Sequence, residues 1–496
     1  MSVLRPSYDP DSVIARALAL RDAGHADAAL VGIQGALSAY PENPRLWQAA
    51  GTIYRSLERS ADAIAAFQRA STLAPDDVRA MHGVAQASLE AGRPASSLFS
   101  HLQKISPGDG AIALGRSAAQ LAEGDGATAV SDLERLVIAN PLWTEGQAGL
   151  ARLRWQLGDG KRFADSFRRA LATHPREIGL WTGLISLLIE IERFDAAAAV
   201  VVEAHAATHG DAALLPLAAV CASETGDIVS ADAIFAALSA SRDLGIAEQH
   251  VRHLLRCGRP DAAATRIEPL LDDPQASRLW PYASLAWRLT DDRRTDWLEG
   301  DPALVGTYEL GLSAADLVGL AGRLRALHVA RRDPLGQSVR GGTQTDGPLF
   351  AHEAPEIRQL RAAVVDAVER HIAAMGTVDP RHPTRRNIGK RFRFAGSWSV
   401  RLTGAGHHSS HIHPQGWLSS ACYIALPPQD LMGPEPAGWL QLGQPPSSLG
   451  LDLQPYRRIA PAAGRLILFP STMWHGTAPI AAGERLTVAF DVAAIG

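Results

Sequence analysis

Cysteine is scarce in this chain of 496 residues, which has three copies, Cys221, Cys257 and Cys422. An odd number of scattered cysteines provides no disulfide framework and is typical of a reducing compartment. No apolar run approaches the roughly 20 residues that a membrane-spanning helix needs. Residues 1–10 lack the basic and then apolar pattern of a secretory signal. These absences predict a cytoplasmic protein with no membrane segment.

A strong excess of charge of either sign is also missing. Lysine and arginine number 48 and aspartate and glutamate 52, which gives a formal net charge of −4. This balance argues against the strongly basic surface that nucleic acids and acidic membranes attract. We therefore expect neither a nucleic acid nor a membrane as a partner. The length alone predicts roughly two to four domains.

The first 290 residues contain a regular repeat. Prolines recur in steps of 34, 32, 34 and 34 residues, at positions 41, 75, 107, 141 and 175. A period near 34 is the signature of tetratricopeptide repeats, in which each copy is a pair of helices. The copy over residues 44–77 carries Trp47, Gly51 and Tyr54 on its first helix and Phe67 on its second, and it resembles the tetratricopeptide pattern position by position.

A single helix pair cannot bury its apolar face alone, so the pairs are expected to stack into a curved solenoid over residues 1–290. We expect about seven or eight pairs. Such an array usually binds a protein or peptide partner, and any binding function would lie on its concave surface. Self-association into a homo-oligomer is the alternative that stays open.

Residues 291–380 are predicted to form a helical connector that packs on the following domain. Ser313 is an N-cap candidate for a helix over residues 314–327. A second helix is expected from about Pro355 to Met375.

The polar, glycine-bearing segment Gln337–Thr345 lies between these two helices. It has two interpretations that stay open, a surface turn or a loop over an active site. In the second interpretation Arg340 or Gln344 touches a ligand. Arg401, further along, is another candidate for substrate contact, although a surface role is equally open.

Residues 381–496 change to a strand pattern. Short runs rich in valine, isoleucine, leucine and aromatic residues alternate with glycine, proline and serine turns. These runs are 392–402, 418–426, 439–442, 465–469 and 486–492. Several short antiparallel strands favour a sandwich or a jelly-roll barrel. The predicted fold class is therefore α+β multidomain, with an all-α solenoid first and a β domain last.

The strongest chemical signal is the segment His411-Ile412-His413, read together with His475 and Arg485. In an extended strand, side chains at i and i+2 point to the same face, so the first two histidines are able to bind one ion together. His475 follows a strand-like run and would complete the site from a neighbouring strand. Arg485 opens the last strand and is suited to hold a carboxylate bidentately.

As a set, these residues resemble a double-stranded β-helix Fe(II)/2-oxoglutarate-dependent oxygenase. The resemblance implies that His411 and His475 bind Fe(II) and that Arg485 binds the remote carboxylate of 2-oxoglutarate. It also implies that Thr487 and Tyr423 contact this co-substrate, that O2 is the oxidant, and that no catalytic residue is needed beyond the metal ligands. The implied activity is that of a dioxygenase, most often a hydroxylase. With the solenoid attached, a protein or peptide side chain is the expected substrate.

One position departs from the pattern of this family, because His413 stands where the family has an aspartate or glutamate. Two interpretations stay open. Either His413 binds the metal and gives a three-histidine site, or it turns away and water or another group takes its place. Imidazole is a good neutral ligand for Fe(II), which favours ligation by His413. The neighbouring His407 and His408 are expected to line the approach or to face solvent.

Three other functions stay open at this point. A three-histidine site suits zinc and hydrolytic or hydration chemistry. A cupin-type dioxygenase also uses three histidines but no keto acid, and it leaves Arg485 unexplained. The third alternative is a scaffold whose oxygenase domain is inactive.

Overall fold

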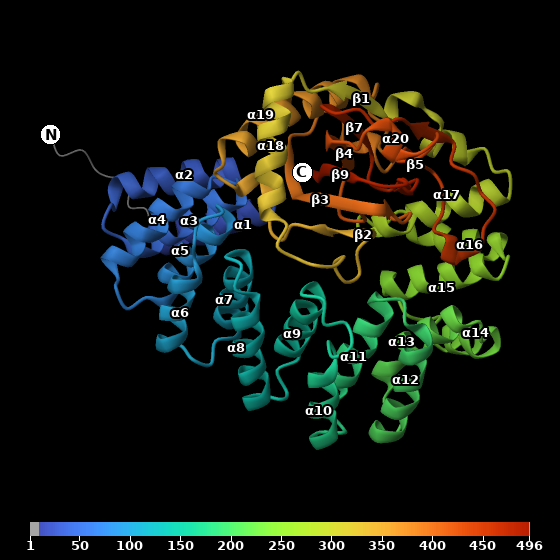
Figure 1. Cartoon of the computed structure of the whole chain (residues 1–496), viewed down its shortest axis with the longest axis horizontal. Coiled ribbons are helices and arrows are strands. Elements are labelled where there is room, and N and C mark those ends of the chain that lie inside the picture. The colour runs from blue at the N-terminus through green and yellow to red at the C-terminus, as the bar shows by residue number, and fades with distance from the viewer. Residues whose placement is uncertain (1–8, 496) are drawn as a thin grey trace.

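The computed structural model describes residues 9–495. The first eight residues, which carry most of the segment without a secretory pattern, lie outside this range. None of the described helices combines the length and the apolar character that a bilayer crossing requires. The helices of the first half form an arc, and this arc curves around a sheet domain built from the second half of the chain (Figure 1).

The arc consists of antiparallel helix pairs that follow the expected repeat. Its helices are α1 (Pro10–Asp22), α2 (Ala26–Ala39), α3 (Pro44–Ser56), α4 (Ser60–Leu73), α5 (Val78–Glu90), α6 (Ser96–Ile105), α7 (Gly110–Ala122), α8 (Gly126–Ala139), α9 (Thr144–Gln156), α10 (Asp165–Thr173), α11 (Ile178–Glu190), α12 (Phe194–Thr208), α13 (Leu215–Thr225), α14 (Ile228–Ala237), α15 (Leu244–Arg256), α16 (Pro260–Ile267) and α17 (Trp280–Leu289). The first helix of several pairs begins after a capping side chain. Asn43, for example, accepts hydrogen bonds from the backbone N–H groups of Arg45 and Leu46. The predicted fold class of the N-terminal part, an all-α solenoid, is confirmed.

Small residues let successive helix pairs approach closely. Gly51 on α3 and Gly83 on α5 both face the ring of Phe67 on α4. A Cβ atom added to these glycines would lie 2.8 Å and 2.4 Å from the ring atoms. Phe67 is only 4% exposed, so its ring fills the space between two repeats. The tetratricopeptide residues of this copy are thus packing residues.

Replacing Phe67 with alanine is expected to lower the free energy of unfolding by about 3–5 kcal/mol, because two glycines leave no side chain able to fill the cavity. Urea unfolding followed by circular dichroism measures this loss. Val31 on the neighbouring α2 is 71% exposed, so Val31→Ala is the matched control and should change stability by less than about 0.5 kcal/mol. Equal stability of the two variants would contradict the packing role of the ring.

The second half of the chain forms two antiparallel sheets. Its strands are β1 (Gly306–Glu309), β2 (Val339–Gln344), β3 (Phe392–His408), β4 (Leu418–Ala425), β5 (Leu440–Leu442), β6 (Arg457–Ile459), β7 (Arg465–Pro470), β8 (His475–Thr477) and β9 (Glu484–Ala494). The larger sheet has the strand order β1-β7-β4-β9-β3-β2, and the smaller has β6-β5-β8. The predicted β domain is therefore present.

Each strand of the larger sheet divides its side chains between two environments. On β9, Leu486, Val488 and Phe490 belong to an apolar cluster with helices α18 (Ala314–Leu327) and α19 (Pro355–Ala374). Arg485 and Thr487 alternate with them and face the smaller sheet. The helices thus cover one face of the larger sheet, and the other face is left for a site between the sheets.

The segment 291–380 differs from the predicted helical connector. Its two helices are present, and Ser313 forms a capping box with Asp316 at the start of α18. However, the segment also contributes β1 and β2, the two edge strands of the larger sheet. The predicted loop Gln337–Thr345 is mostly the strand β2, which pairs with β3. Glycine has a weak strand propensity, but the backbone hydrogen bonds that β2 forms with β3 outweigh this weakness at Gly341 and Gly342.

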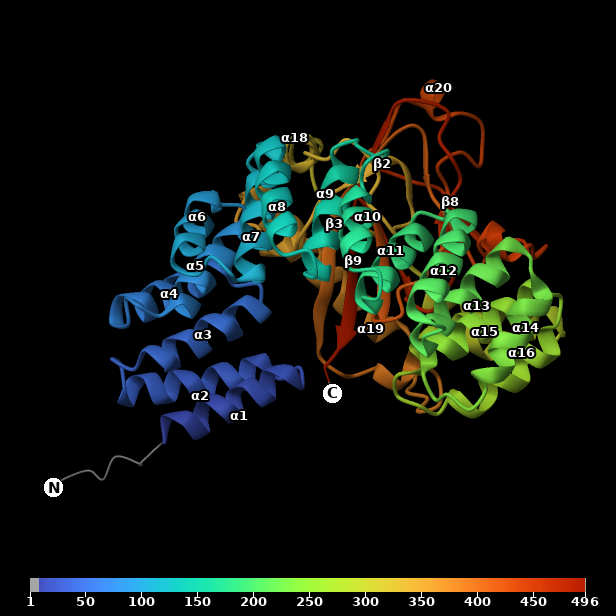
Figure 2. The same cartoon turned by 90° about the horizontal axis from the view of Figure 1, so that it is seen from below.

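The inner side of the solenoid is in contact with the sheet domain along much of its length. The solenoid helices lie beneath the sheet domain in Figure 1 and in front of it in the view from below (Figure 2). Hydrogen bonds and ion pairs join Ser60 to Ala351, Glu58 to Arg361, Trp155 to Asp333, Glu192 to Arg340, Arg252 to Ser448 and Ser277 to Pro414. The solenoid residues in these contacts lie at or near helix ends and in the turns between helices, so the chain itself covers part of this inner edge.

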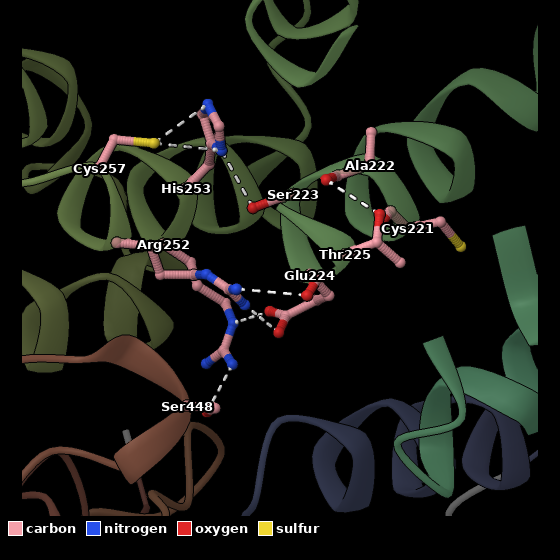
Figure 3. A network of polar contacts seen from close by, with 10 residues as sticks. Cys221, Ala222, Ser223, Glu224, Thr225, Arg252, His253, Cys257 and Ser448 are labelled. Atoms are coloured by element: carbon pink, nitrogen blue, oxygen red, sulfur yellow. Dashed lines mark hydrogen bonds and ion pairs between the residues drawn. The ribbon is translucent and has the colours of Figure 1, made fainter. Parts of the chain in front are cut away.

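One of these contacts rests on a buried ion pair inside the solenoid. Arg252 on α15 donates to Glu224 on α13 at 2.8 Å and to Ser448 of the sheet domain at 2.8 Å. Figure 3 shows the guanidinium of Arg252 between these two partners. Because the side chain of Glu224 is only 5% exposed, this pair fixes the relative position of two repeats and the sheet domain.

Candidate metal centre

Three histidines converge between the two sheets. One ring nitrogen each of His411, His413 and His475 lies within 4.8 Å of the other two. The His411 and His475 ring centroids are 4.1 Å apart. His475 belongs to β8, while His411 follows β3 and pairs with His475 through an isolated bridge. His411 and His413 therefore lie on a short extended segment after β3, whereas the sequence suggested a regular strand.

Each of the three rings has an acceptor for its Nδ1 atom. Nδ1 of His411 lies 2.9 Å from the Ser409 carbonyl oxygen, and Nδ1 of His475 lies 3.0 Å from that of Met473. A carbonyl oxygen only accepts, so both Nδ1 atoms carry the proton. The Nε2 atoms then carry no proton and are available as metal ligands, although the Ser338 hydroxyl lies 3.2 Å from Nε2 of His411. This tautomer is the one in which metal-binding histidines are usually held.

His413 has a different acceptor, which the sequence interpretation missed. Its Nδ1 atom lies 2.6 Å from Oδ2 of Asp491 on β9. The other oxygen, Oδ1, accepts a hydrogen bond of 2.7 Å from Ser419. On the opposite side, the Trp398 ring stacks on His413 with 5.6 Å between centroids. The ring of His413 is thus held from two sides and points toward His411 and His475.

The surroundings of His411 and His475 disfavour the charged imidazolium form. Desolvation of the ring and then the neighbouring His413 lower the pKa of His411 to about 3. Burial also lowers the pKa of His475 well below its ordinary value. Neutral imidazole is the form that binds a metal ion. The donor set therefore fits Fe(II) and other first-row divalent ions.

Arg485 also lies between the two sheets, in the buried region that we call the enclosure. No carboxylate of the described residues pairs with it. It is 1% exposed. Its guanidinium donates to the Gly438 carbonyl oxygen and to Oγ1 of Thr477, each at 3.0 Å. Thr477 is two residues from His475 on the short strand β8, which places Arg485 beside the histidines. Burial lowers the pKa of Arg485.

Two buried polar atoms in this enclosure have no hydrogen-bond partner among the described residues: Nε of Arg485 and the hydroxyl of Tyr423. Tyr423 is 1% exposed and pairs across the sheet with Thr487, which lies two residues beyond Arg485. Buried polar groups normally have a partner. An unpaired guanidinium nitrogen and an unpaired hydroxyl beside a metal-type donor set fit a small anionic ligand that carries a carboxylate.

A further segment reaches the histidines from the solenoid side. We call residues 329–340 the strap. Leu335 of the strap is buried in an apolar cluster of the solenoid with Trp155. At the other end of the strap, Oγ of Ser338 lies 3.2 Å from Nε2 of His411 and 3.1 Å from Nδ1 of His408. The segment Gln337–Thr345 thus does touch the site, but through Ser338, which sequence reasoning did not single out.

The residues predicted to meet substrate form ion pairs with other parts of the chain, with one exception. Arg340 forms an ion pair of 2.5 Å with Glu192 of the solenoid. Arg401 is on the face of β3 opposite to Trp398 and forms an ion pair of 2.5 Å with Glu484. Strand alternation explains this, since Trp398 faces the histidines and Arg401 is three residues away. A substrate contact of Arg340 or Arg401 stays a prediction, and both side chains are held by ion pairs in this structure.

Gln344 is the exception. It pairs across the sheet with Val400 of β3. Val400 is on the same face of β3 as Trp398, so Gln344 lies on the face of the sheet that meets the histidines. Gln344 also lines a cavity of about 460 Å³ between β2 and helices α5 and α7. Its contact with substrate stays a prediction.

Comparison with known proteins agrees with this geometry. Residues 396–491 match the family described as "Putative 2OG-Fe(II) oxygenase". No curated protein matches the chain.

Several solved structures resemble parts of the chain. A prolyl-4-hydroxylase from Pseudomonas putida is 18% identical, and the alignment covers 39% of this chain and 94% of that one with a TM-score of 0.28. A thermophilic TPR protein from Thermus thermophilus is 18% identical over 36% of this chain and 99% of its own, with a TM-score of 0.29. A tetratricopeptide repeat protein from Parabacteroides merdae is 18% identical over 49% and 97%, also with a TM-score of 0.29.

The matched segment contains all three of the converging histidines, the buried arginine and the missed aspartate, and it ends at Asp491. The C-terminal part of the chain is thus similar to the family described as putative 2OG-Fe(II) oxygenases, and a helical solenoid with a repeat of about 34 residues precedes it.

Proposed function

We propose that the protein is an Fe(II)- and 2-oxoglutarate-dependent dioxygenase that hydroxylates a protein or peptide side chain. The observation that carries this proposal is the combination of three converging imidazoles with a buried, carboxylate-free Arg485. A metal site alone needs no such arginine. An enclosed guanidinium is costly to bury without a counter-ion, so its presence supports a dianionic co-substrate.

Each residue has a defined task in this proposal. His411, His413 and His475 hold Fe(II) through Nε2. Arg485 binds the remote carboxylate of 2-oxoglutarate, and Tyr423 and Thr487 line the same end of the enclosure. When bound, the iron and the keto acid supply the oxidising chemistry with O2. The contribution of the protein is to orient these groups and to exclude water.

The substrate class rests on the junction between the two halves of the chain. A cavity of about 750 Å³ lies between the start of α15 and the loop after the metal ligands, with Pro414, Gln415 and Thr472 in its wall. Pro414 directly follows His413. A cavity of this size, shared by the solenoid and the loop next to the metal site, supports the binding of a peptide segment, whereas a small metabolite needs no second domain.

The direct test is to purify the full chain without oxygen, add Fe(II), 2-oxoglutarate and O2, and measure succinate. We expect succinate release that requires both Fe(II) and 2-oxoglutarate and that is slow without substrate. Mass spectrometry of peptides from a protein library should then show a gain of one oxygen atom. Release of succinate at the rate of a blank without protein would contradict the proposal.

Zinc is the second candidate, because three imidazole ligands with an open position also form a hydrolytic zinc site. Metal analysis of the purified protein, combined with the succinate test, separates the two functions. Tight zinc binding with no dependence on 2-oxoglutarate would favour the zinc enzyme. In that function Arg485 has no task.

A further inference from the structure

Asp491 is a carboxylate that the proposed chemistry has not yet used. Its side chain is only 14% exposed. It contacts Nδ1 of His413 and the hydroxyl of Ser419, and no lysine or arginine of the described residues forms an ion pair with it. A carboxylate that is largely shielded from water and has no cation beside it is costly. This cost suggests that a positive charge belongs nearby, and the nearest candidate position is the metal site on the other side of the His413 ring.

We propose that Asp491 supplies, through His413, the negative charge that the more usual iron site takes from a directly bound carboxylate. This inference rests on the proposed function, since it requires His413 to be a metal ligand. Asp491 is then a positioning residue, which acts on the metal through the imidazole.

The three histidines differ in a way that supports this role. His411 and His475 donate to neutral carbonyl oxygens at 2.9 Å and 3.0 Å. His413 alone donates to a carboxylate, at the shorter distance of 2.6 Å. A charge-assisted hydrogen bond of this kind makes Nε2 a stronger donor and fixes the ring orientation. His413 stands where the family has a carboxylate ligand, and it is also the histidine whose Nδ1 donates to the carboxylate of Asp491.

The carboxylate itself is held in place. Ser419 donates to Oδ1 of Asp491, and its hydroxyl also lies 2.9 Å from that of Ser471. The Ser471 carbonyl oxygen accepts a hydrogen bond of 3.1 Å from the backbone N–H of His413. Asp491, His413 and the two serines thus form a closed network, which fixes the carboxylate relative to the ring.

The test uses metal-free full-length protein titrated with Co(II), whose visible absorption reports on coordination geometry without any turnover. We expect Asp491→Asn to weaken Co(II) binding by about 10-fold to 100-fold, because the amide keeps the hydrogen bond but removes the charge. The absorption band should also shift. Asp491→Glu should recover part of the affinity. An Asp491→Asn protein with the wild-type affinity and spectrum would overturn the inference.

A double-mutant cycle separates this inference from the proposed function. His413→Ala should weaken Co(II) binding, and adding Asp491→Asn should then have no further effect, because the charge acts through the removed ring. Loss of affinity with His413→Ala but none with Asp491→Asn rejects only the inference. Unchanged affinity with His413→Ala rejects the three-histidine site and the inference together.

Two more variants guard against a simple folding effect. Ser419→Ala removes the hydrogen bond to one oxygen of Asp491 and should also lower the Co(II) affinity, but by less than Asp491→Asn.

Glu484→Gln is the negative control. It changes a carboxylate on the same strand, β9, whose side chain pairs with Arg325 and Arg401 away from the histidines. We expect no change in Co(II) affinity for this control. A loss equal to that of Asp491→Asn would show that the effect is general to the strand and would overturn the inference.

Discussion

Replacing His475 with alanine is expected to reduce 2-oxoglutarate turnover by about 1,000-fold or more, which corresponds to about 4 kcal/mol. His475 is the most buried of the three histidines, at 6% exposure. Its ring lies against His411 on one side and Phe469 on another, with centroid distances of 4.1 Å and 4.7 Å. No other histidine, cysteine or carboxylate of the described residues belongs to this ligand cluster, so the metal would keep two protein ligands.

Succinate release and the iron content after gel filtration measure this loss. The matched control is His407→Ala, because His407 lies near the site on β3 but outside the histidine cluster. We expect the control to keep most of the activity. If His475→Ala retained its iron and its turnover, the site would lie elsewhere in the chain.

Replacing Arg485 with methionine is expected to lower the affinity for 2-oxoglutarate by about 100-fold to 1,000-fold, since hydrogen bonds to charged groups contribute about 1.5–3 kcal/mol each. The same change should leave the ligand-free protein at least as stable as the wild type. The reason is that methionine removes a fully buried charge that has no carboxylate partner. Loss of binding without loss of stability is an unusual combination and identifies a residue kept for its ligand.

Thermal unfolding with and without 2-oxoglutarate, in the presence of Co(II), measures both effects. The wild type should gain stability from the keto acid, and the methionine variant should not. Arg485→Lys keeps the charge and should retain part of the gain. If the methionine variant were instead strongly destabilised without ligand, Arg485 would be a structural residue, and the case for 2-oxoglutarate would be lost.

Much of this architecture follows from periods that the sequence displays. The 34-residue spacing of the prolines predicts the helix pairs, because one pair and its turns need that length. The alternation around Arg485 and Thr487 predicts which residues of β9 face inward, since Leu486 and Val488 require an apolar partner layer. Ser313 predicts the start of α18 through its capping side chain. All three features depend on residues that are close together in the sequence.

Other features depend on contacts between distant segments and could not be predicted in this way. The strand β2 is rich in glycine and exists because β3 pairs with it. Alternation places Arg401 and Trp398 on opposite faces of β3, but it does not decide which of these faces meets the histidines; the stacking of Trp398 on His413 does. Asp491 is far from His413 in sequence, although one signal was present: it occupies the inward phase of the buried strand that also carries Arg485 and Thr487.

The contact between Gly24 and Ile495 has a consequence for how the chain acquires its structure. The side chain of Ile495 lies against Gly24, in the turn between α1 and α2, and Arg391 pairs with Asp27 nearby. The apolar face of this hairpin packs on α3, so Ile495 adds contact only at the turn. Gly24 and Ile495 are far apart in the sequence, so their contact closes a very long loop, and we expect it to form late in folding.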